Sequence, residues 1–192
     1  MGAEKLTRAI DDMTNAMQLC FDKQLLISGL ILLYSGIDAM GWLNRPKHKA
    51  DSDRDDFIEW ADKYLLPKLK YSCRAIDLYS ARCRFLHSYT GDSALVRKGE
   101  ASYIFYVWGT AEPEALQYLI DKSPTLRKKT RPIMVLHIDD LFGAFKEATE
   151  HFQKDLTKDL AHAKIVYERV TQKYYVGLPP FQFMKDKDQN IT

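Results

Sequence analysis

Cysteine is scarce in this sequence: 192 residues include only Cys20, Cys73 and Cys83, with no Cys-x-x-Cys pair. Each lies within an otherwise helical pattern, which argues against a disulfide framework and against a zinc ribbon. We therefore expect a reducing, cytoplasmic setting. Residues 1–22 carry charges throughout and contain no continuous apolar segment, so we also expect no signal peptide.

The sequence also lacks the motifs of a phosphate-binding loop, of a hydrolase with a nucleophile elbow and of a metal site. Gly29, Gly36 and Gly41 fall inside a helical pattern, not in the strand-turn-helix setting of a phosphate loop. No Gly-x-Ser-x-Gly elbow is present. His151 and His162 are eleven positions apart, whereas metal ligands on a helix normally lie three or four positions apart. We expect neither a cofactor nor a metal ion.

Excess charge is lacking too, because 28 basic and 26 acidic residues give a net charge of only +2. A contact surface for RNA would therefore depend on a local cluster of basic residues. Solvated loops account for most basic runs, but two runs are candidates for contact with a phosphate backbone. They are Arg97 with Lys98, and the group of Arg127, Lys128, Lys129 and Arg131.

What the sequence does contain is one long apolar segment, Leu25–Leu43, which could span a bilayer by its length. Asp38 lies inside it, and a carboxylate at the membrane centre costs about 2.5 to 3.5 kcal/mol. We therefore favour a buried central helix of a bundle over a membrane span. Asp38 then needs a partner, because an unpaired buried ion is costly.

Hydrophobic periodicity predicts a mainly α fold, an up-and-down helical bundle. Besides the apolar helix, helices are expected at 3–21, 53–66, 74–90 and 139–174, the last about nine turns long. We expect one domain over residues 1–184, followed by a disordered polar tail at 185–192.

The region before the long C-terminal helix has a different composition. Residues 93–98 and 101–108 are rich in strand-forming side chains on either side of Gly99, which predicts a β-hairpin. A short helix at 112–122 and a strand at 133–138 should follow. Because roughly 45 residues cannot bury a core of their own, we interpret 93–138 as a small α+β insertion in the bundle.

The most informative stretch is Asp77–Ser93, which contains Arg82, His87 and Tyr89 in an Arg-x4-His-x-Tyr spacing near an expected helix end. An apolar stripe in the same stretch also fits an ordinary core helix. At about 100° per residue, Tyr89 shares the face of Arg82, whereas His87 lies roughly 140° around the helix. Arg82 and His87 can therefore meet at one site only under one of three conditions. The long side chain of Arg82 reaches around the helix, the helix ends near His87, or a second copy of the helix faces the first.

The helical pattern together with Arg82-x4-His87-x-Tyr89 resembles the HEPN superfamily (higher eukaryotes and prokaryotes nucleotide-binding domains). These are helical bundles, often homodimeric, in which Arg-x4-6-His near a helix end marks the ribonucleases. The resemblance implies a metal-independent endoribonuclease, with RNA as substrate and a homodimer as the assembly. The local sequence is also similar to HEPN toxins paired with nucleotidyltransferase antitoxins, which implies a toxin or defence role and such an antitoxin as partner.

The residue types suit this chemistry. The 2′-hydroxyl of RNA must lose a proton, attack the adjacent phosphorus and expel the 5′-oxygen. His87 can exchange protons near neutrality, since the ordinary pKa of histidine is about 6.5. Arg82 presents a fork of donors to phosphate oxygens and can stabilise the phosphorane. One histidine per chain is short of an acid and base pair, which two copies across a dimer axis would supply.

Three further residues are weaker candidates. Tyr89 could hydrogen-bond the phosphate, pack in the core or an interface, or, as the resemblance to the toxins implies, accept a nucleotidyl group. Ser93 could contact phosphate, although a turn serine is the simpler interpretation. Asp38 could orient Arg82 or His87, or form a purely structural salt bridge.

Two departures from the HEPN pattern bear on activity. Cys83 follows the motif arginine where many members carry a polar residue, and the insertion at 93–138 is not part of the minimal bundle. Two alternatives to the nuclease therefore stay open. The protein could bind RNA or a nucleotide without cutting it, or it could be an interaction protein that uses its long last helix.

Overall fold

The computed structural model describes residues 2–49, 51–88, 93–123 and 132–173. Within these ranges the protein is mainly α-helical with one small parallel sheet, so the expected mainly α class is confirmed. The predicted tail at 185–192 lies outside the described residues.

The described helices are α1 (Gly2–Asp22), α2 (Leu26–Asn44), α3 (Arg54–Trp60), α4 (Ala75–Cys83), α5 (Ala94–Arg97), α6 (Pro113–Lys122), α8 (Ile138–Lys158) and α9 (Leu160–Lys173). The strands are β1 (Tyr103–Val107) and β2 (Ile133–His137). Shorter turns continue two of the helices: the π turn η1 (Ala61–Leu65) and the 3-10 turn η2 (Leu66–Lys68) after α3, and the π turn η3 (Arg84–Ser88) after α4.

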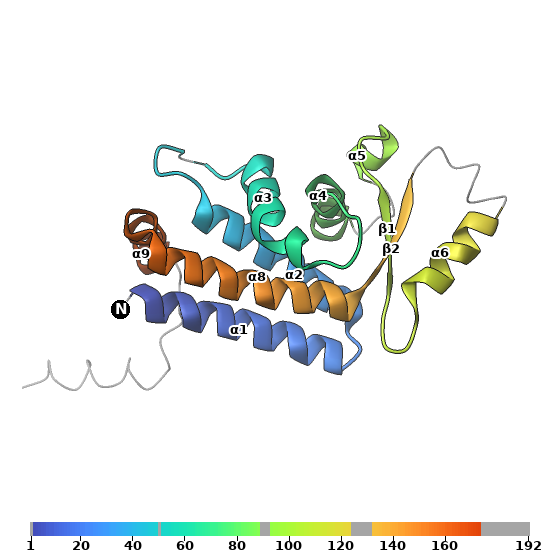
Figure 1. Ribbon diagram of the computed structural model, residues 1–192, viewed down its shortest axis with the longest axis horizontal. Helices are drawn as coiled ribbons and strands as arrows, with labels where there is room; N and C mark the ends of the chain where they lie inside the picture. The colour runs from blue at the N-terminus through green and yellow to red at the C-terminus, as the bar shows by residue number, and fades with distance from the viewer. Residues whose placement is uncertain (1, 50, 89–92, 124–131, 174–192) are drawn as a thin grey trace, which may run out of the picture.

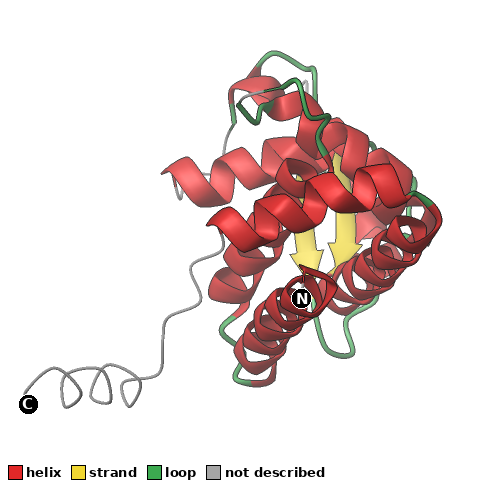
Figure 2. Ribbon diagram, turned by 90° about the vertical axis from the view of Figure 1, so that its left-hand side faces the viewer, coloured by secondary structure: helices red, strands yellow, loops and turns green. Residues whose placement is uncertain are grey.

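Helices α1, α2 and α8 run side by side and form the body of the molecule (Figure 1). Helices α3 and α4 cross on one side of this body, and α9 lies at the end near the N-terminus. The strands and α6 lie at the opposite end. Seen along the long axis, the two strands run parallel behind the helices (Figure 2).

Helix α2 forms the centre of the hydrophobic core. It packs against α1, α3, α4, α8 and α9, and Leu33, Tyr34 and Ile37 are fully buried in it. The approach of its neighbours is close, because a Cβ at Gly36 would lie 2.8 Å from a Met17 side-chain atom. The expectation of a buried central helix therefore agrees with the packing of α2.

By length and composition α2 is also the single described helix that could cross a membrane. Half of its apolar window is buried inside the protein. A core helix of a soluble protein passes the same test of length and hydropathy.

The C-terminal end of α2 is capped by a side chain from α9. Arg169 donates hydrogen bonds from Nη1 to the carbonyl oxygen of Leu43 at 2.9 Å and from Nη2 to that of Pro46 at 3.0 Å. The last carbonyl groups of a helix lack partners within the helix and carry partial negative charge. Arg169 therefore satisfies these acceptors and joins α9 to α2.

The prediction of one helix over 139–174 was wrong, because the backbone breaks at Asp159 between α8 and α9. Asp159 has φ −117° and ψ 87°, and its side chain accepts a hydrogen bond from the His162 amide at 2.9 Å. Asp159 thus starts a new helix. The periodicity passes through the break but misassigns Leu160, which is 77% exposed.

The β-hairpin prediction was also wrong. Residues 94–97 form α5, because the Ser93 hydroxyl caps this helix by accepting a hydrogen bond from the Val96 amide at 3.2 Å. β1 pairs instead with β2, in parallel, with Tyr103 opposite Ile133. Since parallel strands need a crossover connection, α6 lies between them in sequence, and the chain forms a β-α-β unit.

The sheet contributes to the main core. Ile104 of β1 and Leu136 of β2 join the large cluster around α2. Val107 and Val135 form a separate small cluster with Ile120 of α6. The alternation of side chains along the strands thus packs one face of the sheet on the bundle and the other on α6.

Substituting Gly41 tests the close packing of α2 on α3. A Cβ at this position would lie 2.7 Å from the backbone carbonyl oxygen of Asp56, which cannot move without shifting α3. We expect Gly41→Ala to lower the free energy of unfolding by about 1 to 3 kcal/mol despite its higher helix propensity. Urea denaturation measures the change.

Gly143 of α8 provides the matched control, because a Cβ there meets no atom within 4 Å. We expect Gly143→Ala to raise the free energy of unfolding by about 0.5 to 1 kcal/mol. If both variants shift stability by the same amount and sign, the close contact between α2 and α3 is contradicted.

Candidate functional site

An ion pair joins α4 to the central helix. Arg82, near the end of α4, donates a hydrogen bond from Nε to Oδ2 of Asp38 on α2 at 2.6 Å. The two side chains are 20% and 29% exposed. Asp38 therefore has the cationic partner that its place in an apolar helix requires, and this partner, Arg82, is one of the two that the sequence suggested.

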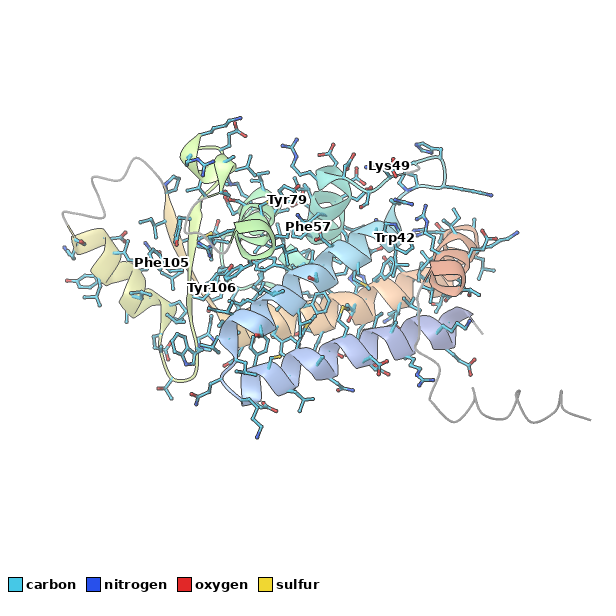
Figure 3. The ribbon with its side chains drawn as sticks, turned by 180° about the vertical axis from the view of Figure 1, so that it is seen from behind. Trp42, Lys49, Phe57, Tyr79, Phe105 and Tyr106 are labelled. Atoms are coloured by element: carbon cyan, nitrogen blue, oxygen red, sulfur yellow. The ribbon has the colours of Figure 1, made fainter. Side chains whose placement is uncertain are left out.

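The surroundings keep the Arg82 guanidinium charged. Partial burial opposes the charge, but the hydrogen bond and the attraction from Asp38 outweigh it, so the pKa of Arg82 lies above its ordinary value. The guanidinium carbon also lies 5.8 Å from the ring centre of Tyr79, within range of a cation-π contact. Tyr79 in turn packs edge-on against Phe57, between α4 and α3 (Figure 3).

The motif helix does not continue as a regular α-helix. After Cys83 the backbone widens into the π turn η3, which contains His87. In a π turn the hydrogen bond closes between residues five apart, so His87 comes nearer to the face of Arg82 than in a continuous α-helix. The side chain of His87 and all of Tyr89 lie outside the described residues.

Arg84 is a residue that the sequence reasoning missed. Its Nη2 donates a hydrogen bond to the carbonyl oxygen of Ile104 at 3.0 Å. The guanidinium carbon lies 4.5 Å from the ring centre of Tyr103 and 4.9 Å from that of Phe85. Arg84 thus connects η3 to β1, which a pattern of local periodicity could not reveal.

The beginning of α4 is anchored by Asp77. Its Oδ1 accepts hydrogen bonds from Nη2 of Arg74 at 2.7 Å and from the backbone amide of Ser102 at 2.7 Å. Burial opposes ionisation of Asp77, but the hydrogen bonds from Arg74 and Ser102 outweigh it and hold its pKa below the ordinary value. Asp77 thus holds the start of α4 near the start of β1, and Asp38 holds the end of α4 against α2.

The other predicted site residues fall into three groups. Ser93 caps α5, and its hydroxyl is also 2.5 Å from that of Ser80, so it is a buried turn residue as the simpler interpretation expected. Arg97 and Lys98 are exposed at the end of α5. The remaining basic residues, Arg127, Lys128, Lys129 and Arg131, lie outside the described residues.

Within the described part of the chain, no three histidine, cysteine or acidic side chains gather as they would around a metal ion. The three cysteines are free thiols and partly buried. The candidate site therefore consists of the Arg82 and Asp38 pair, with the π turn that carries His87 directly after it.

Asp77 gives the anchoring of α4 a measurable pH dependence. Because its pKa is lowered by folding, its contribution to stability is complete above the unfolded pKa, about 3.9, and is lost as pH falls through the folded value. At pH 7 we expect Asp77→Asn to lower the free energy of unfolding by about 2 kcal/mol. The difference in the free energy of unfolding between the variant and the unsubstituted protein should become smaller at pH 2 to 3.

Urea unfolding at several pH values measures this difference, with Asp12→Asn on the exposed face of α1 as the control. The control should leave stability nearly unchanged at every pH. A difference for Asp77→Asn that stays the same at pH 7 and pH 2 would contradict the anchoring role of the carboxylate.

Comparison of the chain with protein-family models, with curated proteins and with solved structures finds no match. The functional interpretation therefore depends on the geometry of the residues themselves.

Proposed function

We propose that the protein is a metal-independent endoribonuclease of HEPN type that cleaves RNA in the cytoplasm. The observation that supports this most strongly is the ion pair of Arg82 with Asp38, which fixes a charged guanidinium at a partly exposed surface. The π turn that follows carries His87 five positions later. The Arg-x4-His motif therefore lies at the end of a helix, which is where the ribonuclease members of the HEPN superfamily carry it.

In the proposed reaction the imidazole of His87 takes the proton of the 2′-hydroxyl. The 2′-oxygen forms a bond to the adjacent phosphorus, and the bond from phosphorus to the 5′-oxygen breaks. An imidazolium returns a proton to the leaving 5′-oxygen, and the products are a 2′,3′-cyclic phosphate and a 5′-hydroxyl. Histidine suits both proton transfers because both of its forms exist near neutral pH.

Arg82 has the electrostatic role in this proposal. Its guanidinium would stabilise the extra negative charge of the phosphorane, an effect commonly worth about 3 to 4 kcal/mol per donor. Asp38 is a positioning residue: by accepting from Nε it fixes the plane of the guanidinium before RNA arrives. A fixed donor needs no reorganisation when charge develops on the phosphate.

The proposed assembly is a homodimer. Each chain supplies one motif histidine, whereas the reaction needs an acid and a base, and two copies of η3 facing each other would provide both. The similarity of the motif to HEPN toxins adds a defence or toxin role, with a nucleotidyltransferase antitoxin as the partner and Tyr89 as the residue it would modify.

A second candidate function is binding of RNA without cleavage. Arg84 and the aromatic side chains around it lie next to the motif on η3 and β1, and they would bind a nucleotide even if the histidine were inactive. Cys83, directly after the motif arginine, is the sequence feature in favour of this alternative.

Cleavage of mixed RNA in EDTA tests the proposal. We expect Arg82→Ala and His87→Ala each to lower the cleavage rate by about 10² to 10³-fold, because each removes one participant in the transition state. Asp38→Asn should lower the rate less, since Arg82 stays in place with a weaker orienting contact. Time courses resolved on denaturing gels provide the measurement.

Arg8→Ala, at an exposed position of α1, serves as the control and should cleave at the unsubstituted rate. Circular dichroism confirms that each variant is folded. Cleavage that persists in both motif variants, or that requires an added metal ion, would exclude the proposed mechanism. RNA binding without cleavage would favour the second candidate.

A further inference from the structure

Arg45, the first residue after α2, is a buried cation whose guanidinium has no oxygen acceptor in the described part of the chain. The residue is only 6% exposed, and its Nε is fully buried without a hydrogen bond. A buried donor without a partner is costly, and a charged donor is more costly still. The burial of Arg45 therefore requires an acceptor that these residues do not supply.

An aromatic ring is the neighbour that Arg45 does have. Its guanidinium carbon lies 5.4 Å from the ring centre of Trp42. An aromatic face attracts the positive charge, but it offers no oxygen atom to the N–H groups. Arg82 is treated differently by the fold, because its Nε has a carboxylate oxygen of Asp38 at 2.6 Å.

A second guanidinium lies close to Arg45. Nη1 of Arg169 donates a hydrogen bond to the backbone carbonyl oxygen of Arg45 at 2.5 Å. The carbonyl contacts of Arg169 use Nη1 and Nη2, and they leave Nε as a spare donor among the described residues. Burial and the charge of Arg45 oppose ionisation more than Asp56 favours it, so the pKa of Arg169 lies below its ordinary value. The two cations therefore repel each other.

The carboxylates of Asp53 and Asp56, at the start of α3, already have other partners. Both accept a hydrogen bond from Nζ of Lys49, at 2.7 and 2.9 Å. The Asp53 side chain also caps α3, and that of Asp56 accepts from the Asp53 amide at 3.0 Å. Lys49 thus balances part of this negative charge, and the positive charge of Arg45 and Arg169 remains in excess.

The elements that carry these groups meet at one end of the molecule. The end of α2 lies against α9, and residues 45–49 continue from it (Figure 1). Trp42 and Lys49 lie at this end, far from the strands (Figure 3). Nη1 and Nη2 of Arg45, which form no hydrogen bond within the described ranges either, retain contact with solvent. A small ligand can therefore reach them.

We propose that the guanidinium groups of Arg45 and Arg169 bind the phosphate group of a small molecule, either free phosphate or a phosphomonoester. A phosphomonoester carries about −1.5 to −2 charges near pH 7 and three acceptor oxygens, which match two cations with unused donors. The fork of N–H groups on a guanidinium fits phosphate oxygens well. A carboxylate would balance only one of the two charges.

This site is separate from the proposed nuclease site and does not depend on it. Asp38 lies seven residues before Arg45, which is about 10 Å along the axis of α2. A phosphate group bound by both arginines would join the end of α2 to α9, because Arg169 belongs to α9. The folded protein should therefore become more stable when the ligand is present.

Isothermal titration calorimetry in a phosphate-free chloride buffer tests the proposal, with inorganic phosphate and glycerol 3-phosphate as the two probes. We expect one site per chain. Arg45→Met should weaken the binding by about 10 to 100-fold, because it removes a charge-assisted donor and keeps an apolar side chain of similar length on Trp42. Arg8→Met, which removes the same charge from an exposed position of α1, is the matched control and should leave the affinity unchanged.

Urea unfolding provides a second measurement that does not need the variant. Phosphate at about 100 times its Kd should lower the unfolding constant of the unsubstituted protein by about 100-fold relative to chloride at the same ionic strength. Arg45→Met should show no such effect. In chloride its midpoint should be the same or higher, because a buried charge without a partner has been replaced by an apolar group.

Binding of either probe that depends on Arg45 supports the site, and the probe that binds more tightly identifies the source of the phosphate group. Equal affinities of Arg45→Met and the unsubstituted protein overturn the assignment, as does a failure of both probes to bind. If phosphate does not change the unfolding of the unsubstituted protein, the proposal fails even where Arg45→Met does not fold. No RNA is used, so failure of the nuclease proposal would leave these readouts unchanged.

Discussion

A single carboxylate in an apolar central helix constrains much of this structure. Asp38 is the only charged residue of α2, and a charge there is tolerable only with a partner close by. Arg82 supplies that partner from α4, which fixes where α4 crosses α2. The same contact fixes the guanidinium that our functional proposal needs, so one requirement of folding and one of chemistry are met by the same pair.

The elements around this pair support it from several directions. Asp77 holds the start of α4 against the start of β1, and Arg84 holds the following π turn against the same strand. The small sheet is thereby linked to the motif helix twice, although it lies at one end of the molecule. In the proposed nuclease, the β-α-β unit therefore steadies the catalytic turn.

Much of the helical architecture could be predicted from the sequence, because α1 and α2 follow strong local patterns. The need of Asp38 for a partner was also evident, since burial of an unpaired charge is costly anywhere. The parallel pairing of β1 with β2 could not be predicted from local composition, because pairing partners thirty residues apart leave no periodic signal. The break at Asp159 was not predicted, because the apolar pattern continues through it. Only the hydrogen bond from the His162 amide to the Asp159 side chain, which caps α9, marks the break. Arg84 was overlooked because its role depends on rings and a carbonyl group that tertiary folding brings together.

The parallel arrangement of the strands also sets an order of assembly. Residues 103–107 have no strand partner until residues 133–137 have been synthesised, and contacts of such separation form later than those between neighbouring helices. A nascent chain that has completed α4 and η3 therefore still lacks the finished sheet to which Asp77 and Arg84 link them, and the sheet is complete only after residue 137 has been synthesised.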